Sequence, residues 1–575
     1  MNSLTARYLA VFSLAFISFL ARAGVGADTP WTTYEAEDMK TTGTVLGPKY
    51  APYLVETESS GQKCVKMGNP GEYVEFTAQS SASAMVVRYN LPDAPAGGGV
   101  DSSLNLYQNG KLLKTLPITS RYSWLYGGYP FTNDPKDGKP RNFYNEFRLK
   151  DLVIAKGDVI RLEKTDDGVD YCIVDLVDLE AVPAPAAVPQ NSLSIAQFGA
   201  DGTGQTDDTE ALRKCLAESV RQGKSVWVPS GIYKLTGDII LPSNAVIQGA
   251  GMWYTTFFGD RELYRQADRR VRFKLTGSNI HLADFAITGK LNYRNDSEPN
   301  DGVMGAGCDH CTISRVWVEH TKVGMWFYNS THMVVEGCRL RDTLADGINL
   351  CVGAHDVVVD NCSTRGTGDD CFAMWPTPSD QGFVAQEPLP GHNVFRHCTG
   401  QLPFLANGGA IYGGADNRME DCLFTDISPG CGILLSTTFP TADADRKIDN
   451  NFSGTTVVRN CDLIRCGGFD HDWAWRPAFV LCLDRRSMSG IDIQNVNIQD
   501  SISDGFGIVA PGSSKGQGTL SNVHLDNVKI SRYGIGAESR HAMWVREDAQ
   551  GGLTVVNSSI PDISNNSTNF TIVKQ

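Results

Sequence analysis

Short runs of alternating apolar and polar residues dominate the chain, and the first group of them lies in residues 28–180. EYVEF (72–76), MVVRYN (85–90) and SLNLYQNG (103–110) alternate with a period of two and are separated by Gly, Pro and Asn turns. This pattern predicts half-buried strands, and we expect an all-β sandwich of the jelly-roll type over 28–180. The uncharged AVPAPAAVPQ (181–190) predicts an extended linker, which we place at 181–191.

The remaining segment, 192–575, repeats one unit of apolar strand, polar turn, second strand and Gly or Asn turn. Asp207, Asp208 and Thr209 predict the start of a helix over 209–220, and no comparable helical pattern follows. Strands that recur at about two dozen residues indicate a solenoid whose coils pair in parallel. We therefore predict a right-handed parallel β-helix over 192–575, with the helix covering its N-terminal end. An array of β-sandwiches is the alternative.

Cysteines mark the repeat. Five hexapeptide-like stretches, MVVEGC, VVVDNC, NVFRHC, NRMEDC and VVRNC, end in cysteines separated by 24, 36, 24 and 39 residues. A cysteine at one place in a repeating unit favours a stack of small buried side chains over disulfides. Two cysteine pairs have alternatives: Cys308 and Cys311 flank His310 in a possible zinc motif that nothing completes, and Cys64 would bridge Cys172 if they were neighbours. The stacked residues are Cys338, Cys362, Cys398, Cys422 and Cys461.

The N-terminus has the pattern of a secretory signal. Arg7 precedes an apolar run at 8–20, and small residues follow, so we predict a signal peptide over 1–27 and a secreted protein, extracellular or periplasmic. An uncleaved anchor is the alternative, but the run is shorter than the roughly 20 residues of a bilayer span. The net charge is −14, with 51 Lys and Arg against 65 Asp and Glu. Nucleic acid and anionic polymers are therefore poor partners, and we expect a monomer without a membrane partner after cleavage.

Three aspartates in two neighbouring repeats are the candidate catalytic residues. Asp346 lies in RDTLADGINL (341–350), and Asp369 and Asp370 lie in RGTGDDCFAM (365–374). Asp346 and Asp370 are 24 residues apart, one repeat, so they should occupy the same position on coils about 4.8 Å apart. Adjacent Asp369 and Asp370 can share a face only at a turn or bulge, which the neighbouring glycines permit.

Converging carboxylates repel one another, which raises at least one pKa toward the range that a general acid needs. One carboxyl could then protonate a glycosidic oxygen while another activates water. The pattern alone leaves a second interpretation open, because stacked aspartates also bind Ca²⁺ or cap turns.

Two sets of motifs resemble known families. FGADGTGQTDDTEAL, VWVPSGIYKL and LPSNAVIQGAG resemble the opening coil of pectin-lyase-like β-helix enzymes. DGINL and TRGTGDDCFAMW resemble the catalytic motifs of glycoside hydrolase family 87, the bacterial α-1,3-glucanases (mutanases) and mycodextranases. That resemblance implies an inverting endo-hydrolase of neutral α-1,3-glucan that releases nigero-oligosaccharides and needs no organic cofactor. It also implies that Asp369 is the general acid and that Asp346 and Asp370 position and deprotonate the water.

Two other functions remain as alternatives. Polygalacturonases also use one Asp followed by an Asp pair, but NGGAIYGGADN (407–417) lacks their histidine, no Arg-x-Lys follows, and the chain is acidic. A non-catalytic adhesin that binds carbohydrate on a β-helical stalk is the other alternative.

Neutral sugars stack on aromatic rings and accept side-chain hydrogen bonds, which gives a set of substrate-binding candidates near the aspartates and in the insertion GGFDHDWAWRP. Each aromatic residue could equally pack between coils, and the insertion could be a solvated loop. The candidates are Trp326, Phe327, Asn349, Trp375, Tyr412, Asp470, His471, Asp472, Trp473 and Trp475.

YEAED (34–38) and YCIVDLVDLE (171–180) resemble the first and last strands of carbohydrate-binding modules of families 6 and 35. The resemblance implies a structural Ca²⁺ held by Glu35, Glu37 and Asp175, whose oxygen ligands suit this cation. The aromatic runs at 121–129 and 142–147 could contact sugar or pack in the core. Such a module would anchor the enzyme on an insoluble polymer, so its removal should weaken activity on insoluble glucan most.

Overall fold

The structure is a computed structural model that describes residues 25–470, 474–484, 486–510, 518–538 and 540–575. Among the described residues nearly all regular secondary structure is β-strand, and the one α-helix there is α1 (Thr209–Gln222). The all-β expectation with parallel sheets is confirmed. No helix among the described residues has the length and apolar character needed to cross a bilayer. Most of the predicted signal peptide lies outside the described residues.

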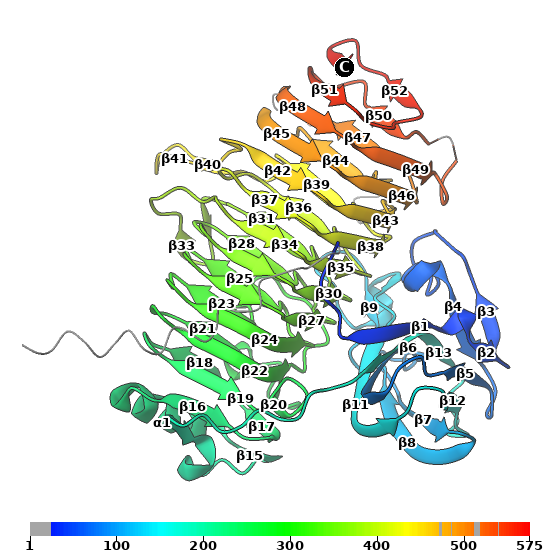
Figure 1. Ribbon diagram of the computed structural model, residues 1–575, viewed down its shortest axis with the longest axis vertical. Coiled ribbons are helices and arrows are strands. Elements are labelled where there is room, and N and C mark those ends of the chain that lie inside the picture. Colours follow the sequence, from blue (N-terminus) through cyan, green and yellow to red (C-terminus); the bar gives the residue numbers. More distant parts are fainter. Residues whose placement is uncertain (1–24, 471–473, 485, 511–517, 539) are drawn as a thin grey trace, which may run out of the picture.

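Two antiparallel sheets form the N-terminal unit, residues 31–180 (Figure 1). Their inward-facing apolar side chains, such as Val74, Met85 and Leu162, form one buried cluster. The first sheet contains β1 (Trp31–Glu35), β3 (Thr44–Leu46), β4 (Cys64–Met67), β6 (Ala82–Asn90), β11 (Asn145–Ile154) and β13 (Cys172–Glu180). The second contains β2 (Lys40–Thr41), β5 (Tyr73–Thr77), β7 (Asp101–Gln108), β8 (Lys111–Thr119) and β12 (Val159–Lys164).

The second unit, residues 192–574, is a solenoid of stacked coils that runs from α1 to the C-terminus (Figure 1). Equivalent strands of successive coils pair in parallel, because each coil repeats the same apolar positions. One row of strands carries the candidate site. It contains β18 (Asp238–Leu241), β21 (Arg272–Leu275), β23 (Gly302–Ala306), β25 (Met325–Tyr328), β28 (Ile348–Cys351), β31 (Phe372–Trp375), β36 (Gly409–Ile411), β39 (Ile433–Ser436), β44 (Phe479–Cys482), β47 (Phe506–Val509), β50 (Met543–Val545) and β52 (Ile563–Asn565).

The other strands of the coils join in a continuous parallel sheet that turns a corner between two faces, and β22 and β24 span that corner. Its strands are β14 (Ser192–Ser194), β15 (Thr203–Asp207), β16 (Ser225–Val228), β17 (Gly231–Leu235), β19 (Val246–Gly249), β20 (Thr255–Gly259), β22 (His281–Thr288), β24 (Thr312–Glu319), β26 (Val334–Glu336), β27 (Arg339–Arg341), β29 (Val358–Asp360), β30 (Ser363–Arg365), β34 (Val394–Arg396), β35 (Thr399–Gln401), β37 (Arg418–Glu420), β38 (Leu423–Ile427), β42 (Thr456–Arg459), β43 (Asp462–Cys466), β45 (Met488–Gln494), β46 (Asn497–Ser501), β48 (Leu520–Asp526), β49 (Lys529–Tyr533), β51 (Gly551–Val556) and β53 (Phe570–Lys574).

The helix lies where the sequence predicts it. Leu212, Cys215 and Leu216 are buried in the same apolar cluster as the first coils, so α1 covers that end of the solenoid. Asp207 accepts a hydrogen bond from the Thr209 backbone N–H, 3.0 Å away, at the start of the helix. Gly223 ends it in the left-handed conformation, with φ of 63°, as is typical of a C-terminal cap.

The cysteine stack is confirmed, because all five repeat cysteines are buried and free. The proposed bridge between Cys64 and Cys172 is wrong, since both thiols are free. In the antiparallel pairing of β4 with β13, Cys172 faces Met67 rather than Cys64, so the two cysteines lie at opposite ends of the paired stretch. Because the five repeat cysteines are buried and unbridged, they pack as small apolar side chains.

The N-terminal unit lies against the middle coils of the solenoid, beside β27 and β30 (Figure 1). Buried ion pairs join the two. Arg365 contacts both Glu146 and Asp178, the latter at 2.8 Å, and Arg339 contacts Glu180 at 2.7 Å. Charges this deeply buried must be paired, so the two units are fixed to one another.

Candidate active site

The three aspartates converge as their spacing predicts. Strand β28 pairs with β31 in the register Ile348 to Phe372, which places Asp346 and Asp370 at the same point on adjacent coils, two residues before each strand. Asp346, Asp369 and Asp370 each bring a carboxylate oxygen to within 4.8 Å of the others. They line an open pocket rather than the interior of the solenoid.

A turn before β31 lets Asp369 and Asp370 share this side. Gly366 has a φ of +73°, a conformation that favours glycine. A Cβ atom on Gly368 would come within 2.4 Å of the Phe404 ring and 2.5 Å of the Leu344 carbonyl oxygen, so only glycine fits there. Thr367 Oγ1 donates to the Asp369 carbonyl oxygen at 2.9 Å and closes the turn.

Neighbouring side chains hold two of the carboxylates in place. Asp370 accepts hydrogen bonds from Asn407 Nδ2 at 2.8 Å and from the Tyr412 hydroxyl, also at 2.8 Å. Asp346 accepts one from Asn349 Nδ2 at 3.3 Å. Both carboxylates are almost fully buried, whereas the Asp369 side chain is 25% exposed and is the most accessible of the three.

Burial and mutual repulsion alter the acidity of the group. Burial, and then repulsion by Asp369 and Asp370, raise the pKa of Asp346 well above its ordinary value. Burial and the Asp369 charge raise the pKa of Asp370 to about 7, although hydrogen bonds from Tyr412 and Asn407 oppose the rise. The adjacent carboxyls of Asp346 and Asp370 therefore retain a proton near neutral pH.

The pocket has a volume of about 210 Å³ and combines polar and aromatic walls. Trp326, Trp375 and Phe439 line one part, and Lys322 and Asp380 line another. Trp326 and Trp375 meet edge to face with ring centroids 6.1 Å apart. Acidic groups beside aromatic surfaces are what hydrolysis of a sugar polymer requires.

Two family descriptions match the chain. "Alpha-1,3-glucanase catalytic domain D1" matches residues 28–182, and "Alpha-1,3-glucanase catalytic domain D2" matches residues 205–571. The chain belongs to the α-1,3-glucanase catalytic-domain family. The expectation of a glycoside hydrolase is confirmed at the level of this family.

Solved structures of α-1,3-glucanase catalytic domains match the fold of this protein over nearly its whole chain. The Agl-KA catalytic domain is 25% identical with a TM-score of 0.87, covering 97% of this chain and 100% of that one. The catalytic unit of the thermostable α-1,3-glucanase of glycoside hydrolase family 87 from Streptomyces thermodiastaticus strain HF3-3 is 31% identical with a TM-score of 0.81, covering 95% and 96%. A family 87 α-1,3-glucanase catalytic domain in complex with nigerose is 26% identical with a TM-score of 0.80, covering 95% and 98%.

Curated relatives match shorter stretches. The pre-neck appendage protein of Bacillus phage B103 is 26% identical over 190 residues, which are 32% of this chain and 21% of that protein. This chain therefore spans about a fifth of the length of that relative.

Arg294 is a site residue that the sequence did not reveal. Its Nη2 atom lies 2.8 Å from Asp369 Oδ2, and its Nη1 atom donates to the Gly368 carbonyl oxygen at 2.8 Å. Tyr129 of the N-terminal unit covers the guanidinium, with the Arg294 Cζ atom 4.4 Å from the ring centroid, and its hydroxyl bonds to Arg294. An arginine in a loop with no motif around it gives no signal in one sequence.

The other substrate-binding candidates have different positions in the structure. Trp326, Asn349, Trp375 and Tyr412 line the pocket. Tyr412 differs from the expectation of a stacking platform, because its buried hydroxyl bonds to Asp370. Asp470 pairs with Arg476 away from the residues that line the pocket. His471, Asp472 and Trp473 lie outside the described residues, Phe327 is buried in the solenoid core, and Trp475 packs against Phe469.

The aromatic residues of the N-terminal unit occupy two different places, a buried cluster and the wall of the pocket. Trp124, Phe143 and Tyr144 pack together in a buried cluster, so they support the unit rather than bind sugar. Tyr129 is half exposed and lines the pocket of the solenoid. The N-terminal unit of this α-1,3-glucanase-family chain therefore contributes directly to the site.

The predicted calcium ligands provide oxygens, but one is already engaged. Asp175 pairs with Arg88 at 2.5 Å and accepts from the Ser60 backbone N–H at 2.9 Å. Glu35 Oε2 and Glu37 Oε2 are buried, and among the described residues neither has a hydrogen-bond partner. Burial and the nearby Asp175 charge raise the pKa of Glu35 to about 8. Two orphaned carboxylate oxygens fit a hard cation, which would satisfy them and ionise Glu35.

Two clusters of three potential ligands were found among the described residues, and the predicted calcium set is not one of them. One is the group of Asp346, Asp369 and Asp370, and the other is Asp309, His310 and His332. Cys308 and Cys311 point inward and are buried, with Cys308 Sγ 3.2 Å from Ser330 Oγ. The two cysteine thiols therefore face the interior, whereas the His310 side chain is 60% exposed.

Proposed function

We propose that this protein hydrolyses α-1,3-linked glucan. The convergence of Asp346, Asp369 and Asp370 in an open pocket with aromatic walls carries the proposal. Similar structures named as family 87 α-1,3-glucanase catalytic domains were solved with nigerose and with tetrasaccharides, which supports a glucan of this linkage. Three of them carry alanine for aspartate at positions separated by 23 residues and by one, the spacing of the three aspartates here.

In the proposed reaction, Asp369 takes up the proton that Asp346 or Asp370, whose pKa values are raised, retains near neutral pH, and donates it to the leaving glycosidic oxygen, which leaves that neighbouring carboxylate free to accept a proton from water. Asp369 is the most exposed of the three carboxyls, and Arg294 would stabilise the carboxylate that remains after donation. Asp346 and Asp370 hold the attacking water and take its proton. Their rigid hydrogen bonds to Asn349, Asn407 and Tyr412 fix where that water binds.

We propose inversion of the anomeric centre, as the family resemblance implies. The spacing of the carboxylates favours the alternative, because inverting pairs usually stand roughly 6.5–9.5 Å apart and retaining pairs about 5–5.5 Å. Here the oxygens lie within 4.8 Å. Proton NMR of the first product decides: inversion releases a β-anomer from the α-linkage, and retention releases an α-anomer.

The activity is tested by incubating purified protein with insoluble α-1,3-glucan and measuring new reducing ends. We expect release of nigero-oligosaccharides of several lengths, the sign of internal cleavage. Polygalacturonate and nigeran serve as parallel substrates, since the first tests the pectinase alternative and the second shows whether an α-1,4 linkage is cut. Binding to the glucan with no release of reducing ends would favour the adhesin and overturn the proposal.

Further features complete the proposal. We infer that the protein is exported, that its solenoid is a right-handed parallel β-helix, and that it acts as a monomer. The N-terminal unit would bind glucan as a carbohydrate-binding module does, in addition to providing Tyr129. A structural Ca²⁺ would be held by the unpartnered oxygens of Glu35 and Glu37. Asp175, which is paired with Arg88, would add a nearby negative charge.

A further inference from the structure

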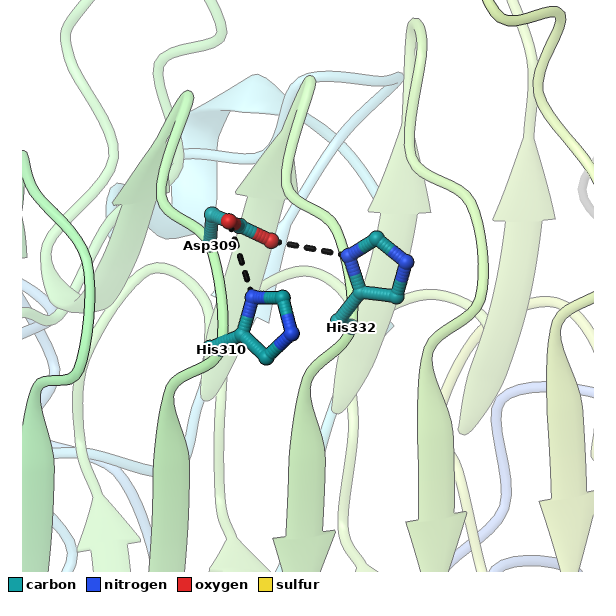
Figure 2. A group of neighbouring side chains, drawn as sticks. All are labelled: Asp309, His310 and His332. Carbon is teal, nitrogen blue, oxygen red and sulfur yellow. Dashed lines mark hydrogen bonds and ion pairs between the residues drawn. The ribbon is translucent and has the colours of Figure 1, made fainter.

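A second cluster of ligating side chains lies on a ridge of the solenoid (Figure 2). Asp309 and His310 occupy the turn between β23 and β24, and His332 occupies the equivalent turn between β25 and β26 on the next coil. These turns follow the strands of the row that carries the site, whereas Asp346 and Asp370 precede theirs. The cluster is therefore at the opposite edge of that row from the catalytic carboxylates.

The coil repeat brings the two imidazoles together. Asp309 and Thr331 form a parallel bridge between the coils, and the next residues, His310 and His332, have nearly identical left-handed φ angles of 52° and 50°. The same backbone conformation one coil apart directs both rings the same way. They stack with centroids 4.6 Å apart and 26° between planes.

The Asp309 carboxylate contacts both of the stacked rings (Figure 2). Its carboxylate oxygens are 2.8 Å from His310 Nδ1 and 2.8 Å from His332 Nδ1. Thr331 Oγ1 donates to the same carboxylate at 2.7 Å and holds its orientation. The Asp309, His310 and His332 side chains are 40%, 60% and 49% exposed, so an ion can reach all three from solvent.

Two imidazole nitrogens and one carboxylate oxygen suit a borderline transition-metal ion and not Ca²⁺ or Mg²⁺, which prefer oxygen. With metal–ligand distances of about 2.0–2.1 Å, tetrahedral donor atoms lie about 3.3 Å apart. The present N···O distances of 2.8 Å need only a small expansion, which exposed side chains allow. His355, the next histidine along the ridge, pairs with Asp356 at 2.8 Å, which leaves the fourth position to water.

We propose that Asp309, His310 and His332 bind a divalent transition-metal ion of the Zn²⁺ class on the surface of the solenoid. The ion would clamp two successive coils through ligands that are 22 residues apart in the sequence. A ligand that binds only the folded chain stabilises it, so the metal would raise the melting temperature. It would leave glucan hydrolysis unchanged, because it lies at the other edge of the row.

The test uses the full mature chain without a histidine tag. Calorimetric titration with Zn²⁺ should show one ion per chain, and Cu²⁺ should give an EPR spectrum with nitrogen hyperfine splitting from imidazole. His310→Asn and His332→Asn should each weaken Zn²⁺ affinity at least about tenfold, equivalent to about 1.4 kcal/mol. Each should also abolish the metal-dependent rise in melting temperature.

Two variants serve as controls. His392→Asn makes the same change in the equivalent turn two coils beyond His332, at a residue outside the cluster, and should bind Zn²⁺ like the wild type. Asp370→Asn should also keep the site, which separates it from the catalytic carboxylates. Absence of one-to-one Zn²⁺ binding overturns the proposal. So does wild-type affinity in both histidine variants, or loss of the ion in Asp370→Asn.

Discussion

Arg294 and Asp369, 75 residues apart in the chain, form an ion pair in which Nη2 lies 2.8 Å from Oδ2. Arg294 is almost fully buried, and the ring of Tyr129 from the N-terminal unit lies against its guanidinium. The carboxyl proposed as the acid is therefore oriented by groups from both units. The N-terminal unit is part of the site, as well as a candidate for holding the polymer.

Replacing the arginine tests this arrangement. Arg294→Lys keeps a positive charge but loses the planar contacts to Asp369, Gly368 and Tyr129, so we expect kcat to fall roughly 10- to 100-fold on a soluble nigero-oligosaccharide. Tyr129→Phe should reduce kcat less, since only the hydroxyl contact is lost. Tyr107→Phe, which removes a half-buried hydroxyl of the N-terminal unit that donates to Glu163, is the control. Equal rates in Arg294→Lys and the wild type would contradict a role in orienting Asp369.

The carboxylates themselves give the second prediction. Asp346→Asn, Asp369→Asn and Asp370→Asn each remove a proton-transfer partner with little change in shape, so kcat should fall by about 10²- to 10⁴-fold while substrate binding is retained. Reducing-end release and glucan co-sedimentation measure the two separately. Asp526→Asn, at an exposed position of β48, should leave both unchanged. Near-normal turnover in any of the three site variants would remove that residue from the mechanism.

The third prediction concerns stability and pH. The folded-state pKa of Asp370 is raised from 3.8 to about 7, so its proton stabilises the fold at low pH and that stability is lost as pH rises from about 4 to about 7. A rise of about three pH units in the pKa corresponds to at most about 4 kcal/mol, shared with the neighbouring carboxyl of Asp346. Urea unfolding at several pH values should show a smaller decline for Asp370→Asn than for the wild type. An identical decline of stability with pH in the variant and the wild type would mean that the fold does not raise the pKa of Asp370.

The interface between the units gives the fourth prediction. Arg365→Met removes the cation that contacts both buried carboxylates and leaves Glu146 with only Arg341, at 3.7 Å, which should lower the free energy of unfolding by about 3–5 kcal/mol. Arg532→Met breaks an exposed pair with Asp500 and should cost less than about 1 kcal/mol. Chemical denaturation compares the two directly. Similar small losses in both would show that the buried pairs do not hold the units together.

The same interface changes an expectation drawn from sequence. A detachable binding module predicts that removal of 28–190 weakens activity mainly on insoluble glucan. Because the N-terminal unit supplies Tyr129 and the carboxylates that neutralise Arg339 and Arg365, we now expect its removal to reduce activity on soluble substrates as well. Assays of the truncated chain on both substrates distinguish the two expectations.

Some misplaced residues show where sequence patterns stop being informative. The motif CDHC at 308–311 predicts ligands close in sequence, but the segment is a turn with His310 in the left-handed conformation, so both cysteines are buried while Asp309 and His310 face solvent and His310 meets His332 on the next coil. Likewise Tyr412 was chosen as an aromatic platform, and its hydroxyl instead bonds to Asp370. In both cases the partner lies one coil or more away.

The repeat of the coils, and with it the meeting of Asp346 and Asp370, can be read from the order of residues along the chain. Parallel strand pairing stacks residues one repeat apart, so a spacing of 24 residues in the chain becomes a contact in space. The tertiary structure alone decided that Arg294 and Tyr129 join Asp369, because they come from a loop and from the other unit, with no fixed spacing to the repeat. Contacts of that kind depend on how whole surfaces pack and on which charges are buried together.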